Sequence, residues 1–162
     1  MKKLLLWINA FLLSIICGAA LFFLVAIQPN WKSGNVEDII IMNSFFHVSD
    51  ASIFFKANLV PSVIVSLICM VVYWKADKVL RNLVVITFLI NAAMFAFTFL
   101  FFIPKNDYLF VQHKTDFDPA LVRDYVSSWM TGQYFRIAFY LLGLFFAARS
   151  IHQSYLVHPL SK

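Results

Sequence analysis

Four long apolar runs, separated by shorter polar stretches, dominate the pattern of residues along the chain. They cover residues 4–27, 51–74, 82–103 and 133–150. About 20 apolar residues, at a helical rise of about 1.5 Å each, cross the roughly 30 Å of hydrocarbon in a membrane. The pattern therefore predicts an all-α fold, in which four transmembrane helices form a bundle and residues 1–162 make a single integral membrane domain.

The two longer polar stretches contain helical patterns of their own. In the first, Glu37 and Asp38 follow a Ser-Gly-Asn turn, and acids suit the first turn of a helix. In the second, Asp118 precedes Pro119, a capping acid followed by the residue favoured at the first helical position. We therefore expect two short amphipathic surface helices in the external loops, the second leading into the fourth span with a bend at Gly132.

Composition and charge exclude several classes of protein and indicate an orientation. Hydrophobic residues make up 62% of the 162 residues and charged residues 13%, and the mean hydropathy of +0.80 lies far from the norm of soluble domains. The net charge of +5 resides on bases that flank apolar runs rather than on one patch, so the expected partner is the lipid bilayer and no nucleic acid.

The bases are distributed unevenly between the two sides of the spans. One side carries seven lysines and arginines against one acid, and the other carries six against seven. Because cytoplasmic loops are enriched in bases, both termini are expected in the cytoplasm and the protein in the plasma (inner) membrane. The first run continues to Ile27, which is too long for a cleaved signal and indicates a retained span.

Small residues recur in the first span. Ala10, Ser14 and Gly18 are spaced by four, so this stripe is expected to pack against another helix, and it leaves open a homo-oligomer or a membrane partner subunit. Cys17 and Cys69 have no second cysteine nearby. A disulfide oxidoreductase is therefore not expected, and the two are interpreted as packing residues unless they meet between helices.

Candidate chemistry concentrates where the third span ends and the fourth begins. Asn106 and Asp107 leave the third span, while the spacing of Trp129, Gln133 and Arg136 by four and three puts them on one helical face. Arg136 is a charge well within an apolar run and needs a partner. It either reaches a lipid phosphate or a loop acid, or it binds an oxygen of a substrate.

Further polar and aromatic candidates lie within the third span. An amide in the membrane is costly unless it is hydrogen-bonded, so Asn91 either bridges two helices or contacts a ligand. Thr98 lies between Phe97 and Phe101. A pocket walled by Phe97, Phe101 and Trp129 beside Arg136 would favour ligand binding, whereas a solid core with the small-residue stripe exposed would favour a docking role.

The histidines and acids lack the spacing of common metal sites. The sequence has no His-Glu-x-x-His, no Glu-x-x-His pair and no two histidines in opposed spans, which argues against zinc proteases, di-iron bundles and bis-histidine haem. A surface metal site formed by His47, His113 and Asp116 is the weakest hypothesis. No metal and no cofactor is expected.

Two short motifs resemble those of the anthrone oxygenase-like family of small four-helix integral membrane proteins. They are Phe97-Thr98 followed by Pro104-Lys105-Asn106-Asp107-Tyr108-Leu109, and Trp129 with Gln133 and Arg136. The order of features over most of the chain is also similar to this family. The resemblance implies a four-helix membrane fold. It also implies the reaction of members studied as enzymes, which oxidise anthrones to anthraquinones without an evident metal or flavin motif.

The resemblance also implies roles for particular residues. Asn106, Gln133 and Arg136 would hold a phenolic oxygen, with Arg136 stabilising an enolate that reacts with oxygen, and Asp107 or His47 would be the base. Further candidate substrate contacts are Trp129, Asn91, Thr98, Phe97 and Phe101. Two classes of function stay open. One is a cofactor-poor oxygenase or binding protein for a lipophilic aromatic or quinone-like molecule, and the other is a non-catalytic lipid-binding or accessory module.

Overall fold

The computed structural model describes residues 2–46, 51–110 and 114–157. Every regular element in these residues is helical, with no strand among them. The elements are, in order, α1 (Lys2–Phe22), η1 (Phe23–Ile27), η2 (Gln28–Asn30), α2 (Val36–Phe45), α3 (Ala51–Val72), α4 (Lys78–Phe97), η3 (Thr98–Phe102), α5 (Ile103–Leu109) and α6 (Pro119–Val157). η1 and η3 are single π-helical turns, and η2 is a 3₁₀ turn.

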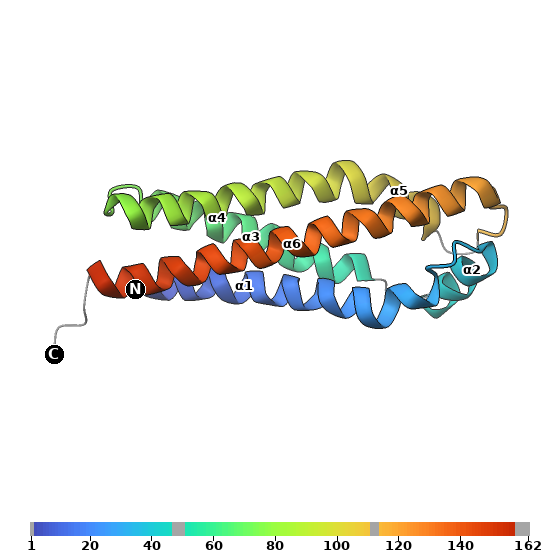
Figure 1. Cartoon of the computed structure of the whole chain (residues 1–162), viewed down its shortest axis with the longest axis horizontal. Coiled ribbons are helices and arrows are strands. Elements are labelled where there is room, and N and C mark those ends of the chain that lie inside the picture. The colour runs from blue at the N-terminus through green and yellow to red at the C-terminus, as the bar shows by residue number, and fades with distance from the viewer. Residues whose placement is uncertain (1, 47–50, 111–113, 158–162) are drawn as a thin grey trace.

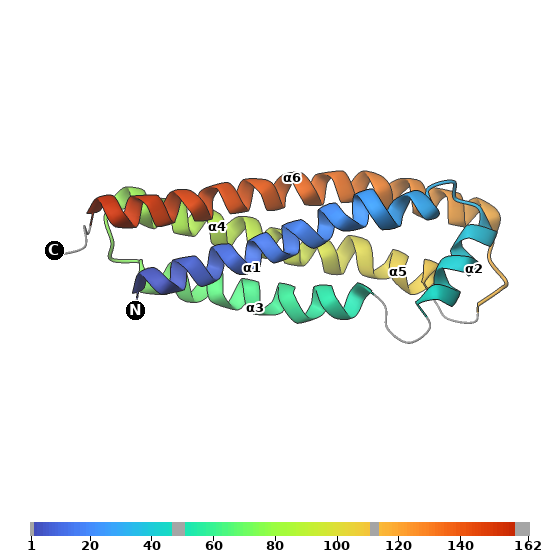
Figure 2. The ribbon, with the colours of Figure 1, turned by 90° about the horizontal axis from the view of Figure 1, so that it is seen from below.

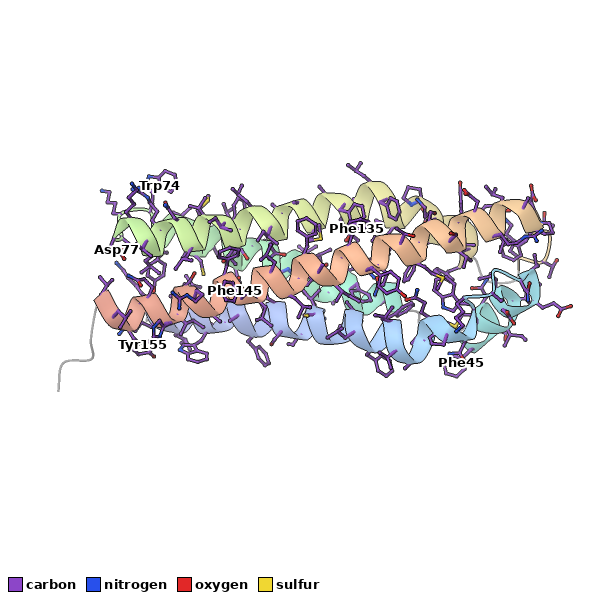
Figure 3. The ribbon with its side chains drawn as sticks, viewed as in Figure 1. Phe45, Trp74, Asp77, Phe135, Phe145 and Tyr155 are labelled. Atoms are coloured by element: carbon purple, nitrogen blue, oxygen red, sulfur yellow. The ribbon has the colours of Figure 1, made fainter. Side chains whose placement is uncertain are left out.

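Four helical stretches are long and apolar enough to cross a membrane, which confirms the predicted four-span bundle. They are Lys2–Asn30, Ile53–Val72, Lys78–Leu109 and Pro119–Val157. The four run side by side along one long axis (Figures 1 and 2). Phe45 of α2 and Phe135 and Phe145 of α6 are all exposed (Figure 3). Such an apolar exterior suits contact with lipid rather than water, and the chain is a small four-helix membrane protein.

The two ends of the bundle differ. At one end, here called the α2 end, α2 crosses the ends of the long helices (Figure 1). At the opposite end, α1 and α6 lie together near the loop between α3 and α4 (Figure 2). There, Trp7 Nε1 donates to the Tyr155 hydroxyl at 3.5 Å, and Lys3 Nζ lies 4.1 Å from the centre of the Tyr155 ring.

The fourth span is longer than predicted, and the expected second surface helix is part of it. Asp118 caps the helix as expected, since its Oδ1 accepts from the Ala120 N–H at 2.8 Å. From there α6 continues to Val157 without a break, so the predicted bend at Gly132 is wrong. Gly132 is buried, and a Cβ at this position would overlap the Phe101 ring. The glycine therefore lets η3 approach α6, rather than bending the helix.

The small-residue stripe of α1 is only partly buried within the chain, so packing of the stripe against another helix stays a prediction. Ala10 is buried, but Ser14 and Gly18 are exposed, and a Cβ at Gly18 would meet nothing within 4 Å. The buried face of α1 mixes large and small residues, namely Leu6, Asn9, Ala10, Leu13, Ile16, Cys17 and Ala20. Large apolar side chains provide more buried surface per contact than small ones do. Cys17 and Cys69 are both buried free thiols.

Candidate ligand-binding cavity

A cavity of about 350 Å³ lies between the helices near the α2 end. Its volume falls in the range of pockets that hold small molecules. Its apolar wall comes from six elements and consists of Phe23, Met42, Phe46, Phe55, Leu59, Val60, Phe99, Ile103, Phe110 and Trp129. Its polar side chains are Asn43, Lys56, Thr98, Asn106, Asp107 and Arg136. A mostly aromatic wall with a few polar groups suits a lipophilic ligand that carries one or two oxygens.

Arg136 brings a buried positive charge to the wall of this cavity. It extends from α6 and is 4% exposed. One Nη group donates to Gln133 Oε1, and Nε has no hydrogen-bond partner. No carboxylate of the described residues, Asp107 included, forms an ion pair with it.

Three aromatic rings surround the Arg136 guanidinium. Its Cζ lies 4.0 Å from the ring centre of Phe102, 5.0 Å from that of Phe55 and 5.6 Å from that of Trp129. Such cation–π contacts stabilise a cation by about 0.5–2 kcal/mol each. They leave its net charge unchanged, so the wall of the cavity stays positive.

Gln133 holds Arg136 in place without lining the cavity. It is fully buried, and its Nε2 donates to the carbonyl oxygen of Ala20 on α1 at 2.9 Å. Its Oε1 accepts from Arg136. The amide therefore links the backbone of α1 to the guanidinium, and it acts as a positioning residue for Arg136.

Asn106 and Trp129 form a second polar point on the wall. Trp129 Nε1 donates to Asn106 Oδ1 at 2.8 Å, and both residues line the cavity. The bond uses the carbonyl side of the amide, so the Asn106 NH₂ group stays available as a donor. Asp107, the next residue, is exposed and lines the same cavity. The structure thus brings Arg136, Asn106 and Asp107 to one cavity, as their positions in the sequence suggested.

Two polar residues of the cavity escaped the sequence analysis. Lys56, from α3, is exposed and lines the cavity, and its signal in the sequence is a lone lysine within the apolar run Ile-Phe-Phe-Lys-Ala-Asn-Leu-Val. Asn43, from α2, donates from Nδ2 to the Leu109 carbonyl at 2.9 Å. A single asparagine in a surface helix carries no comparable signal. Thr98 lines the cavity as well, but its Oγ1 donates to the Met94 carbonyl at 2.8 Å.

Asn91 lies away from the cavity, in a polar network between three helices. Its Nδ2 donates to Ser62 Oγ at 2.7 Å and to Ser66 Oγ at 2.9 Å. Ser66 Oγ in turn donates to Asn9 Oδ1 at 2.7 Å. Of the two interpretations of Asn91, these contacts match the bridge between helices, here α4, α3 and α1.

The remaining candidates do not line the cavity or lie outside the described residues. Phe97 and Phe101 stack on each other, with ring centres 4.8 Å apart and planes inclined by 17°. Neither ring is part of the cavity wall. His47 and His113 are not among the described residues, so neither the candidate base nor the surface metal site can be placed. Within the described residues, no three His, Cys, Asp or Glu side chains form a cluster that could hold a metal.

The fold and the cavity define a class, a small four-helix membrane protein with a cationic, aromatic-lined cavity at one end of the bundle. Comparison with protein-family models, curated proteins and solved structures finds no match for the chain.

Proposed function

We propose that the protein binds a lipophilic aromatic or quinone-like molecule in this cavity and orients an acidic oxygen of that molecule toward Arg136. The observation that carries the proposal is the buried guanidinium of Arg136, which has no anionic partner among the described residues. Removing an ion from water costs several kcal/mol, and that cost falls when an opposite charge is near. An enolate, phenolate or carboxylate in the cavity would supply that charge.

The chemistry that we propose follows the resemblance to the anthrone oxygenase-like family. An anthrone loses a proton from its methylene carbon, and the resulting enolate oxygen is stabilised by Arg136 and by the Asn106 NH₂ group. The carbon then reacts with O₂. One oxygen atom becomes the new carbonyl of the anthraquinone, and the other leaves as water with the two hydrogens that the methylene carbon lost.

Asp107 is the proposed base for this reaction. It lines the cavity next to Asn106 and is exposed, so it can return its proton to solvent. A carboxylate is a weak base toward carbon, and it becomes effective when the enolate is stabilised at the same time. The uneven distribution of bases supports an orientation in which this end of the bundle faces away from the cytoplasm, with the protein in the plasma membrane.

The experiment is the oxidation of anthrone by the purified protein in lipid nanodiscs, followed by the absorbance of anthraquinone. We expect turnover above the uncatalysed rate, and about a 100-fold loss in Arg136→Gln because a positioned charge is removed. Arg123→Gln is the matched control, since Arg123 is exposed on the same helix and does not line the cavity. If Arg136→Gln folds and turns anthrone over at the wild-type rate, the proposal is wrong.

A second candidate function is a docking module in a membrane complex. The observation that favours it is the exposure of Ser14 and Gly18 on α1, where another helix could approach closely. The same experiment separates the two candidates. A pure docking module would not oxidise anthrone, whereas the wild-type protein of the first proposal does.

A further inference from the structure

Two apolar residues of the cavity wall are also exposed at the surface of the bundle, as the polar Lys56 and Asp107 are. Val60, on α3, is 41% exposed, and Phe99, on η3, is 46% exposed. A side chain that contributes to a cavity wall and to the outer surface marks an opening of that cavity. Both residues belong to helical stretches that are apolar enough to span a membrane.

The packing of the helices leaves this opening between α3 and η3. α3 packs against α1 and α4, whereas η3 and α5 pack against α4, α6 and each other. Residues of α3 and residues of η3 both line the cavity, so the cavity separates the two elements. In both views of the bundle, α3 stops short of α5 along the long axis (Figures 1 and 2).

The route along the bundle axis, in contrast, passes through a packed core. Trp31, Ile39 and Leu109 are fully buried and belong to one hydrophobic cluster at the α2 end. Trp31 packs edge-on against Trp129, with ring centres 4.9 Å apart. A ligand that entered from this end would have to part these contacts.

The opening lies at the depth of the hydrocarbon layer. The exposed Trp74 and the neighbouring Arg81 mark the interface at the end of the bundle opposite to α2. At about 1.5 Å per residue, Val60 lies roughly 21 Å from Trp74, and Phe99 roughly 27 Å from Arg81. Both distances fall within the roughly 30 Å of hydrocarbon, in the leaflet nearer the α2 end.

We propose that the ligand enters the cavity sideways from the lipid, through a portal between α3 and η3 flanked by Val60 and Phe99. This inference rests on the proposed function, and it adds that the ligand is one that dissolves in the membrane before it binds. Lys56 lies four residues before Val60 on the same face of α3 and also lines the cavity. It is placed to attract the acidic oxygen of the ligand at the polar edge of the portal.

The test uses a chemical label at the portal that can be attached and later removed. Val60→Cys is made in a protein whose buried native thiols are replaced, Cys17→Ala and Cys69→Ala, and it is labelled in nanodiscs with a benzyl methanethiosulfonate. The probe is alizarin, a dihydroxyanthraquinone with an acidic phenol, and its binding is followed by quenching of tryptophan fluorescence. We expect the label to slow both association and release of the probe by roughly tenfold or more. A reductant that removes the label should restore both rates.

Two labelled variants serve as controls. Ile64→Cys lies one turn further along α3, where the side chain is exposed but does not line the cavity, and Phe45→Cys lies on α2 at the axial end. Neither label should change the rates. In a further control, the label is attached after alizarin has bound. A label that blocks the portal then traps the bound alizarin, whereas a label that occupies the binding site itself displaces it.

The outcomes are distinct. If labelled Val60→Cys binds and releases alizarin at the unlabelled rate, or if the label expels bound probe, the portal is wrong while the proposed binding function stands. If the unlabelled protein does not bind alizarin at all, the proposed function fails and the portal fails with it. Slower rates in labelled Phe45→Cys alone would assign entry to the axial end instead.

Discussion

The guanidinium of Arg136 is held by one side-chain amide and three aromatic rings, none of which carries a negative charge. An arginine that only snorkels keeps its charged head in water or among phosphates. Arg136 is instead buried beside a cavity, and a buried charge without an opposite charge is costly. The burial of Arg136 is explained best by a bound ligand that supplies the opposite charge.

Changing Gln133 tests this at the scale of a single residue. In Gln133→Glu the new carboxylate can still accept from Arg136, but it neutralises the charge that the cavity offers. Close charge pairs are coupled by more than about 1.4 kcal/mol, so the affinity for alizarin should fall by roughly tenfold or more. Fluorescence titration measures the change.

Tyr134→Phe is the control for this substitution, because Tyr134 is the next residue on α6 and is exposed on the outside of the bundle. Its affinity for alizarin should equal that of the wild-type protein. An unchanged affinity in a folded Gln133→Glu protein would mean that the charge of Arg136 takes no part in binding.

At the scale of elements, the close approach of α6 and η3 depends on Gly132. A methyl group at this position would overlap the Phe101 ring, which is stacked on Phe97 and so has little freedom to move. We expect Gly132→Ala to lower the free energy of unfolding by about 1–3 kcal/mol, the usual cost of overpacking. The measurement is thermal unfolding in detergent, followed by circular dichroism.

Gly18→Ala is the matched substitution, since a Cβ there meets nothing within 4 Å. Its stability should equal the wild-type value or exceed it by up to about 1 kcal/mol, because alanine has the higher helix propensity. If the two alanine variants unfold at the same temperature, the packing of η3 on α6 is not what Gly132 provides.

The helices also show which features of the fold could be predicted from the sequence pattern and which could not. The apolar runs predicted four spans because their length alone is sufficient, and Asp118 with Pro119 predicted the start of α6. The bend expected at Gly132 did not appear, because a glycine can equally serve close packing, and only the position of Phe101 decides between the two. The stripe of small residues is exposed at Ser14 and Gly18, so whether another helix packs there depends on a partner that the spacing alone does not identify.

At the scale of the whole molecule, the cavity was predictable only in part. Arg136, Asn106 and Asp107 were found because charge and amide groups stand out beside an apolar run. Lys56 and Asn43 were missed, because their place in the cavity depends on how α3 and α2 meet the third and fourth spans. Such contacts join residues far apart in the sequence, so the spacing of residues within a single helix does not predict them.

On the proposed function, Arg136 recognises an acidic oxygen on a lipophilic aromatic ligand. The most direct measurement compares the affinities of alizarin and of anthraquinone, which lacks the phenols, in wild-type and Arg136→Gln protein in nanodiscs. We expect the wild-type protein to prefer alizarin by about tenfold or more, and the variant to lose that preference while still binding both weakly. An equal preference in the two proteins, or none in the wild type, would contradict the claim.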